Sequence, residues 1–151
     1  MIKLICIGKI KEKYLQSAIM DYVTRIGKYT KIEIVELNNV LKDSKTEILK
    51  KEGEAILKYV KDKDYVITLE IDGKNINSLS LASKIDNIFN NYPNITFIIG
   101  GSYGLDDSVK DRSNYSLSFS NLTFPHQLFR VMLLEQIYRA FKINNNESYH
   151  K

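Results

Sequence analysis

Short apolar strands alternate with helical patterns along the whole chain, and this order restricts the fold more than any other feature. Runs typical of strands cover residues 2–7, 31–37, 64–71, 95–99 and 115–119. Helices are predicted over 13–26, 44 to about 60, 78–89, 106–112 and 126–143. Strands that alternate with helices form βαβ units. The sequence therefore predicts an α/β fold, with a mostly parallel sheet and helices on both faces.

Local signals mark the ends of several predicted elements. Ser44 and Glu47 have the spacing of a capping box at the start of the second helix. Ser78 is expected to cap the third helix. An Asp72-Gly73 turn is expected after the third strand, since this dipeptide favours turns.

Length and composition indicate one domain over residues 1–151. Hydrophobic residues make up 44% of the 151 residues and charged residues 26%, which is typical of a globular protein with a core of its own. No apolar stretch reaches transmembrane length, and the first apolar run is too short for a signal peptide. We expect a cytoplasmic protein without a membrane partner. The single cysteine, Cys6, is expected to be a small buried side chain.

The positive charge is concentrated at the start of the chain. Residues 1–31 hold seven basic and two acidic residues, whereas the rest holds 15 basic and 16 acidic residues. A clustered basic face suggests a polyanionic partner such as nucleic acid. A solvated lysine-rich surface would leave the same pattern.

Several familiar kinds of site are unsupported by the sequence. There is no P-loop, no Gly-x-Gly-x-x-Gly after the first strand and no Gly-x-Ser-x-Gly elbow. Two histidines and one cysteine give no metal-ligand spacing, so no metal is expected.

Residues 117–130 connect the last predicted strand to the last helix through a short polar loop. Pro125 and His126 open that helix, because proline is tolerated in a first turn. The loop thus lies at the carboxyl end of a strand, where α/β proteins tend to bind ligands. Its main-chain groups could read a planar heterocycle, with Leu122 and Phe124 packed on the ring. Alternatively, Thr123 simply caps the helix.

The segment Gly100-Gly101-Ser102-Tyr103-Gly104 follows a predicted buried strand. Glycines at this place let a ligand approach the backbone closely. A tight turn from strand to helix would explain the same glycines equally well.

The last helix is apolar on nearly every side, which indicates burial against more than one surface. One side could face the sheet and the other a second subunit. Glu135 and Arg139 have the spacing of a helical ion pair. The polar tail ends in Tyr149 and His150, and at a terminus fraying is the ordinary alternative to a role.

Three stretches together resemble the RlmH family, the bacterial large-subunit ribosomal RNA (pseudouridine-N3) methyltransferases of the SPOUT superfamily. They are Ile-Ile-Gly-Gly-Ser-Tyr-Gly-Leu at 98–105, the block from Phe119 to Arg130, and Leu-Glu-Gln-Ile-Tyr-Arg-Ala-Phe-Lys-Ile at 134–143 with the terminal Ser-Tyr-His-Lys. Gly8-Lys9 and the segment 69–74 also look like the family, although Glu70 stands where some members have Asp. The resemblance spans the whole chain.

The resemblance implies a C-terminal trefoil knot, an α/β knot of the SPOUT kind, that holds S-adenosylmethionine. Carried onto this chain, the cofactor-binding residues are Leu69, Gly100, Gly101, Phe119, Ser120, Asn121, Leu122, Thr123 and Phe124. It also implies a homodimer through the C-terminal helix, in which one subunit's tail reaches the other's site. The implied partner is the ribosome, and the implied reaction is N3-methylation of a pseudouridine in 23S ribosomal RNA.

Methyl transfer from a sulfonium needs mainly orientation of two reactants and loss of the N3 proton. We hypothesise that His150 and either Arg139 or Arg130 stabilise the developing anion or contact phosphate, and that Tyr149 stacks on the base. Two alternatives remain at this point. One is a non-catalytic ribosome- or RNA-binding knot protein, and the other is a methyltransferase for a different RNA nucleoside.

Overall fold

One parallel sheet organises the chain. The computed structural model describes residues 1–151, and its five strands are β1 (Ile2–Ile7), β2 (Ile32–Leu37), β3 (Asp64–Asn75), β4 (Asn94–Ile99) and β5 (Tyr115–Ser118). They lie in the order β2-β1-β4-β3-β5, and every pair is parallel. The predicted α/β class and parallel sheet are confirmed.

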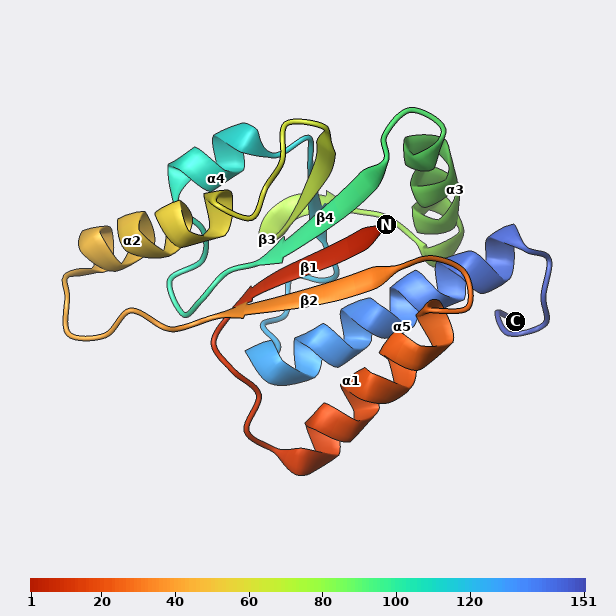
Figure 1. The fold of residues 1–151 in the computed structure, drawn as a ribbon, viewed down its shortest axis with the longest axis horizontal. Coiled ribbons are helices and arrows are strands. Elements are labelled where there is room, and N and C mark those ends of the chain that lie inside the picture. The colour runs from red at the N-terminus through yellow and green to blue at the C-terminus, as the bar shows by residue number, and fades with distance from the viewer.

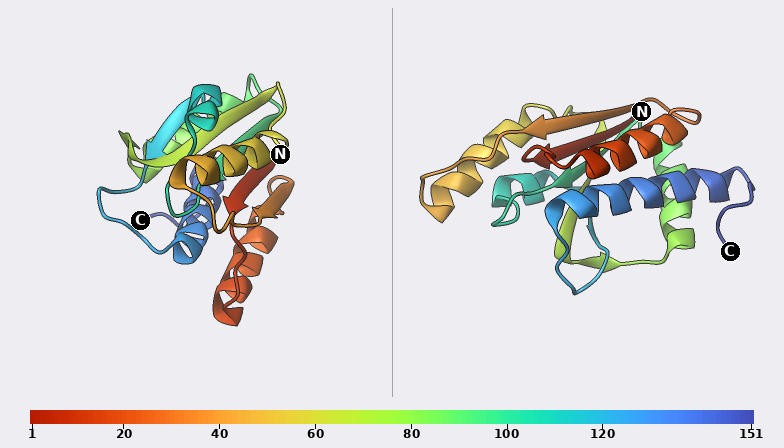
Figure 2. Two further views of the ribbon diagram at one scale, coloured as in Figure 1. Left: turned by 90° about the vertical axis from the view of Figure 1, so that its left-hand side faces the viewer. Right: turned by 90° about the horizontal axis from the view of Figure 1, so that it is seen from below.

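Five helices connect or follow the strands: α1 (Lys13–Ile26), α2 (Lys45–Leu57), α3 (Ser78–Phe89), α4 (Asp107–Arg112) and α5 (His126–Asn144). Each predicted helix is present, with ends displaced by three residues or fewer. α1, α3 and α5 cover one face of the sheet, and α2 with α4 covers the other (Figures 1 and 2). The prediction of helices on both faces is confirmed.

Alternation along the strands explains the two cores. Side chains of a strand point to opposite faces in turn. In β1, Leu4 and Cys6 join the larger cluster under α1, α3 and α5, while Ile5 and Ile7 join the smaller cluster under α2 and α4. Cys6 is fully buried as predicted, and burial raises the pKa of its thiol to about 12.

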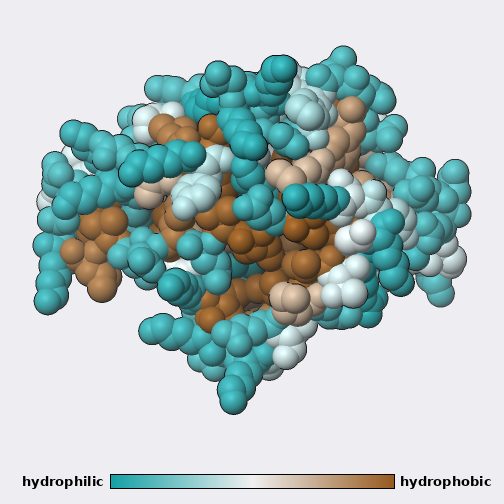
Figure 3. Space-filling view, viewed as in Figure 1, coloured by the Kyte–Doolittle hydropathy of each residue, from teal (hydrophilic) through white to brown (hydrophobic).

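The edge strand β2 is less covered than β1. Its side chains are half-buried or exposed, whereas every residue of β1 is buried. In the space-filling view apolar residues gather over the middle of the face that shows β1 and β2, and polar residues surround them (Figure 3). No helix of the chain is long and apolar enough to cross a membrane.

The third strand is longer than its sequence pattern predicts. The expected end at residue 71 with an Asp72-Gly73 turn is wrong, because β3 continues to Asn75. Its register with β5 shifts between Leu69 and Lys74, both of which pair with Leu117. A Cβ at Gly73 would lie 2.8 Å from the carbonyl carbon of Leu117, so glycine is needed for this close passage and not for a turn.

Two predicted caps differ in outcome. Ser44 accepts a hydrogen bond from the Glu47 amide at 3.3 Å, which confirms it as the cap of α2. The cap of α3 is Asn77, whose side chain accepts from the Ser80 amide, and not Ser78. Asn and Ser both cap well, so adjacent candidates could not be ranked from sequence.

Two buried charged residues, Asp64 and Lys3, link the amino ends of β1, β3 and β4. Asp64 of β3 accepts hydrogen bonds from Asn94 at 3.0 Å and from Thr96 at 3.0 Å, both on β4. Lys3 of β1 lies 3.9 Å from the same carboxylate and donates to the Tyr59 carbonyl. Burial opposes ionisation of Asp64, but hydrogen bonds from Lys61, Asn94 and Thr96 and the charge of Lys3 outweigh it and lower its pKa.

We predict that Asp64→Asn lowers the free energy of unfolding by about 3–5 kcal/mol, because it leaves the buried Lys3 ammonium without a carboxylate partner. Urea denaturation monitored by circular dichroism measures this, with the exposed Asp86→Asn as the control. The folded-state pKa of Asp64 lies below its ordinary value of 3.8, so its stabilisation is present above pH 3.8 and is lost as the pH falls further. The difference between wild type and variant should therefore shrink in acid. Equal stabilities at pH 7 would contradict the role given to this carboxylate.

Candidate functional site

A cavity of about 290 Å³ opens at the carboxyl edge of the sheet. Three segments form it: residues 69–72 in the second half of β3, the end of β4 with the loop that follows (99–105), and the segment from the end of β5 into the next loop (117–124). Lys110 of α4 and the first turn of α5 complete its wall. This is the edge at which open α/β sheets bind ligands, because successive loops converge there.

The structure brings the predicted cofactor-binding residues together. All of them line this cavity except Asn121, whose side chain is exposed at the tip of the loop. Leu69 lies within β3, Gly100 follows β4 and Phe119 follows β5, yet all three line the same cavity. The parallel pairing of β4 and β5 with β3 brings these sequence-distant residues together.

The glycine loop is tightly packed from behind. A Cβ at Gly101 would lie 2.8 Å from a carboxylate oxygen of Glu52, and a Cβ at Gly100 would collide with the Gly104 carbonyl. Glu52 itself is buried, and burial raises its pKa. Gly104 has φ +83° and open space where a Cβ would be. The turn's own backbone thus requires glycine at position 100, whereas at position 101 the absence of a side chain leaves room for Glu52.

The loop 119–124 leaves its main chain free. None of its amide or carbonyl groups bonds to another backbone group. The amide of Leu122 bonds to the Ser120 hydroxyl at 3.0 Å, and the Ser120 carbonyl accepts from Ser118. Thr123 does not cap α5, whose N-cap is Pro125 without a side-chain bond. The alternative that Thr123 is a cap is therefore wrong, and the loop's donors and acceptors remain for a ligand.

Three aromatic rings frame the cavity on the side of α5. Phe119 and Phe129 meet edge to face with centroids 4.8 Å apart, and Phe124 stacks on Phe129 at 6.0 Å. Such a cluster offers an apolar surface beside free main-chain groups, which suits a flat heterocycle.

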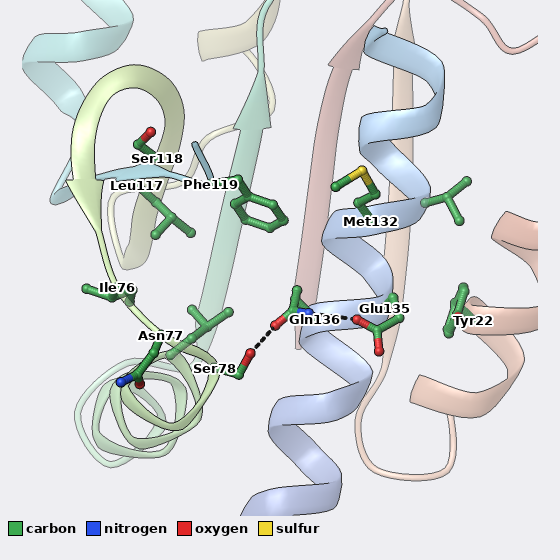
Figure 4. A pocket seen from close by; sticks show the side chains of 12 residues that line it. Tyr22, Ile76, Asn77, Ser78, Leu117, Ser118, Phe119, Met132, Glu135 and Gln136 are labelled. Atoms are coloured by element: carbon green, nitrogen blue, oxygen red, sulfur yellow. Dashed lines mark hydrogen bonds between the residues drawn. The ribbon is translucent and has the colours of Figure 1, made fainter. Parts of the chain in front are cut away.

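A second cavity of about 550 Å³ lies on the other side of Phe119, between α1, α3 and α5 (Figure 4). It shares Leu117, Ser118 and Phe119 with the first cavity. Gln136 accepts a hydrogen bond from Ser78 at 2.7 Å across it, and Glu135 points toward Tyr22 (Figure 4). Most of its other lining is apolar.

The C-terminal tail packs on α5 through Tyr149. The Tyr149 hydroxyl donates to Glu135 at 3.0 Å, and its ring lies 4.9 Å from that of Tyr138. Burial, with the Glu135 carboxylate, raises the pKa of Tyr149 to about 12. Arg139 lies over the Tyr149 ring and also pairs with Glu135, as its spacing predicted.

His150 is oriented by Arg139. A guanidinium nitrogen of Arg139 lies 3.1 Å from His150 Nδ1. Since arginine only donates, Nδ1 must accept, which places the ring proton on Nε2. In this arrangement His150 therefore presents an N–H donor to its surroundings.

Arg130 lies apart from the other candidate residues for catalysis. It is nine residues from Arg139, about two and a half helical turns, so the two side chains leave α5 on opposite sides. Arg130 is only 2% exposed and lines neither cavity. Its guanidinium donates to Glu36 at 2.8 Å and to the carbonyls of Ile7 and Gly8, while its Nε has no partner. It joins α5 to the carboxyl ends of β1 and β2.

Among the lining residues that the sequence does not mark as candidates are the charged Glu70, Asp72 and Lys110. Glu70 differs from the Asp of some family members, Asp72 belongs to an expected turn, and Lys110 lies on a short helix with no distinctive pattern. The alternation of β3 puts Glu70 on the same face as Val66 and Thr68, toward α4, and this was the available signal. No group of three or more His, Cys, Asp or Glu residues is arranged to hold a metal ion.

Comparison with known proteins identifies the class to which this fold and cavity belong. The family model described as "Predicted SPOUT methyltransferase" matches residues 1–150, and the chain belongs to this family. Among its relatives, the ribosomal RNA large subunit methyltransferase H of Clostridium botulinum is 54% identical over 99% of both chains. The putative ribosomal RNA large subunit methyltransferase H of Methanococcus vannielii is 50% identical, again over 99% of both chains.

A solved structure supports the fold alone. A probable methylase family protein from Haemophilus influenzae superposes with a TM-score of 0.58 at 15% identity. The match covers 99% of this chain and 70% of that one.

We predict that Glu36→Gln lowers the free energy of unfolding by about 1–3 kcal/mol, because the buried Arg130 loses its only carboxylate. Glu33→Gln, at an exposed position of the same strand, serves as the control. Chemical denaturation of both variants measures the difference. If the two variants unfolded alike, Arg130 would not depend on Glu36 for its burial.

Proposed function

We propose that this chain is an S-adenosylmethionine-dependent methyltransferase that acts on N3 of a pseudouridine in large-subunit (23S) ribosomal RNA. The observation that carries the proposal is the cavity at the carboxyl edge, where the free main chain of residues 119–124 meets the glycine loop and Leu69. Full-length relatives named as ribosomal RNA large subunit methyltransferase H support the substrate.

The residues of this cavity fit the proposed cofactor. An adenine ring needs an apolar surface with a few hydrogen-bonding groups at its edge. Leu122, Phe124 and the Phe119–Phe129 pair provide the surface, and the unpaired amides and carbonyls of the loop provide the edge contacts. The remainder of the cofactor would be enclosed by Leu69, Gly100, Gly101, Ser120 and Thr123, with Asn121 at the rim of the cavity.

We further propose that the C-terminal part of this single domain, residues 1–151, is knotted as in SPOUT proteins. The close passage of Gly73 over the backbone of Ser116 and Leu117 supports this, since a crossing of the chain there would leave no room for a side chain. The register between β3 and β5 shifts at the same place, and residues 70–73, which are left out of the pairing, would give the chain extra length for such a crossing.

A homodimer through α5 would complete the site. On one side of α5, Leu128 is exposed and Val131 and Met132 are half-buried, at the spacing of a single helical face. The second cavity lies beside this face. Pairing of two α5 helices would bring the Tyr149-His150 tail of one subunit near the cofactor cavity of the other.

The chain's own residues have definable tasks in such a reaction. When bound, S-adenosylmethionine supplies an activated methyl group on a sulfonium. The loop 119–124 then fixes the donor, while Tyr149 stacks on the target base. Once the N3 proton has passed to solvent water, negative charge spreads to the ring oxygens, and the His150 Nε2–H with Arg139 can donate to them. Glu135 keeps Arg139 and Tyr149 in place.

Charge supports an RNA partner. Lys9, Lys11 and Lys13 are exposed around the start of α1, within the basic first 31 residues. Phosphate contacts from such lysines give salt-dependent binding. With ribosomes as partner, we place the protein in the cytoplasm.

The direct test is incubation with labelled S-adenosylmethionine and, separately, ribosomes, free subunits and transfer RNA. We expect label in large-subunit RNA, and nuclease digestion with mass spectrometry should place it on N3 of pseudouridine. Ribosomes lacking that pseudouridine are the control and should stay unlabelled. Label confined to transfer RNA, or to another nucleoside, would assign a different substrate, and absence of label with every RNA would favour a non-catalytic binder.

We predict that His150→Ala lowers the single-turnover methylation rate by about 100-fold, since one donor to the developing anion is lost. His150→Gln, which keeps an N–H donor, should fall less. Affinity for S-adenosylhomocysteine, measured by calorimetry, should stay within about twofold in both. A deletion after Asn146 should abolish methylation with the same retention of binding. Undiminished methylation by the deleted chain would exclude the tail from the reaction.

A further inference from the structure

The cofactor cavity contains a carboxylate held in a fixed position by two hydroxyl groups. Thr68 and Ser116 donate to the same Glu70 oxygen, Oε2, at 2.7 and 2.5 Å. These hydroxyls come from two neighbouring strands, β3 and β5. The other oxygen, Oε1, receives neither bond and lies 3.7 Å from the Lys110 ammonium.

The contact between Glu70 and Lys110 is too loose to account for this arrangement. At 3.7 Å it exceeds hydrogen-bond length, and the Lys110 side chain is 46% exposed. Ion pairs of this kind contribute little to stability. Glu70 by contrast is only 18% exposed, so its orientation is set by the hydroxyls and not by the lysine. A preset carboxylate oxygen and a movable ammonium thus face one cavity.

We infer that Glu70 and Lys110 bind the two charged ends of an α-amino acid group. Glu70 Oε1 accepts from the α-ammonium, and Lys110 turns from Glu70 to the α-carboxylate. An amino acid carries one positive and one negative group, and this pair offers the opposite charge to each. The inference rests on the proposed function, in which the methyl donor has such a group at the end opposite to its adenine.

This assignment divides the cavity into two parts. The loop 119–124 and its aromatic rings take the nucleoside, and the β3–α4 side takes the amino acid. A nucleoside ligand that lacks the amino acid group should therefore bind without contacting Glu70. A purely structural role, in which Glu70 only links β3 to β5 through Ser116, predicts the same loss for every ligand.

Two ligands separate these roles. S-adenosylhomocysteine carries the amino acid group, and 5′-methylthioadenosine has the same nucleoside without it. By calorimetric titration we expect Glu70→Gln to lower the affinity for S-adenosylhomocysteine about 10- to 100-fold. The affinity for 5′-methylthioadenosine should stay within about twofold of the wild-type value. Lys110→Met, at an exposed position where folding is not at risk, should also lower the affinity for S-adenosylhomocysteine alone, by a smaller factor. Asp111→Asn, exposed on the same helix, is the control and should change neither.

The two affinities test the amino acid subsite directly. The inference would be overturned if Glu70→Gln and Lys110→Met lowered the affinity for both ligands equally, or lowered it for neither. A selective loss in Asp72→Asn in place of Glu70→Gln would also overturn it, because Asp72 lines the same cavity. If the wild-type chain bound neither ligand, the proposed cofactor itself would be wrong. Binding of both ligands by every variant would leave the cofactor standing and remove only the amino acid subsite.

Discussion

The close passage of β3 against β5 at Gly73 is the contact on which the site depends. Backbone lies directly on backbone there, because the residue has no side chain to keep the strands apart. The passage brings Ser116 to Glu70 and sets Leu69 beside Leu117. Without it the end of β3 would turn away from the sheet, and one wall of the cavity would be missing.

Buried charges at both ends of the sheet hold this geometry in place. At the amino ends, Asp64 joins β3 to β4 and to Lys3 of β1. At the carboxyl ends, Arg130 joins α5 to β1 and β2. Removing one partner of a buried charge is more costly than losing a surface pair, so Asp64 and Arg130 tie the strands to defined partners. The last helix therefore begins in a defined place beside the cavity at the carboxyl edge of the sheet.

Patterns of period 2 and 3.6 predicted the class of fold and nearly every element, because burial on one face or two dictates which positions are apolar. The motifs of the resemblance named eight of the residues that line the cavity, while their role toward a cofactor stays a prediction. The failures share a cause, which is that side-chain partners come from distant segments. Nothing local distinguishes Gly73 from a turn glycine, Arg130 from Arg139, or Glu70 from a surface acid. Their roles depend on Leu117, Glu36 and Ser116, which only the assembled sheet brings near.

The order of strands also governs how the chain can fold as it is made. Ile2 pairs with Ile95, and the cluster beneath α1, α3 and α5 includes Phe141 near the end of the sequence. Until that segment has emerged, apolar faces of β1 and α1 lack their cover, and such long-range pairing folds slowly while exposed surface favours aggregation. A protein that we propose to act on ribosomes thus reaches its own native state only after nearly its whole length has left one.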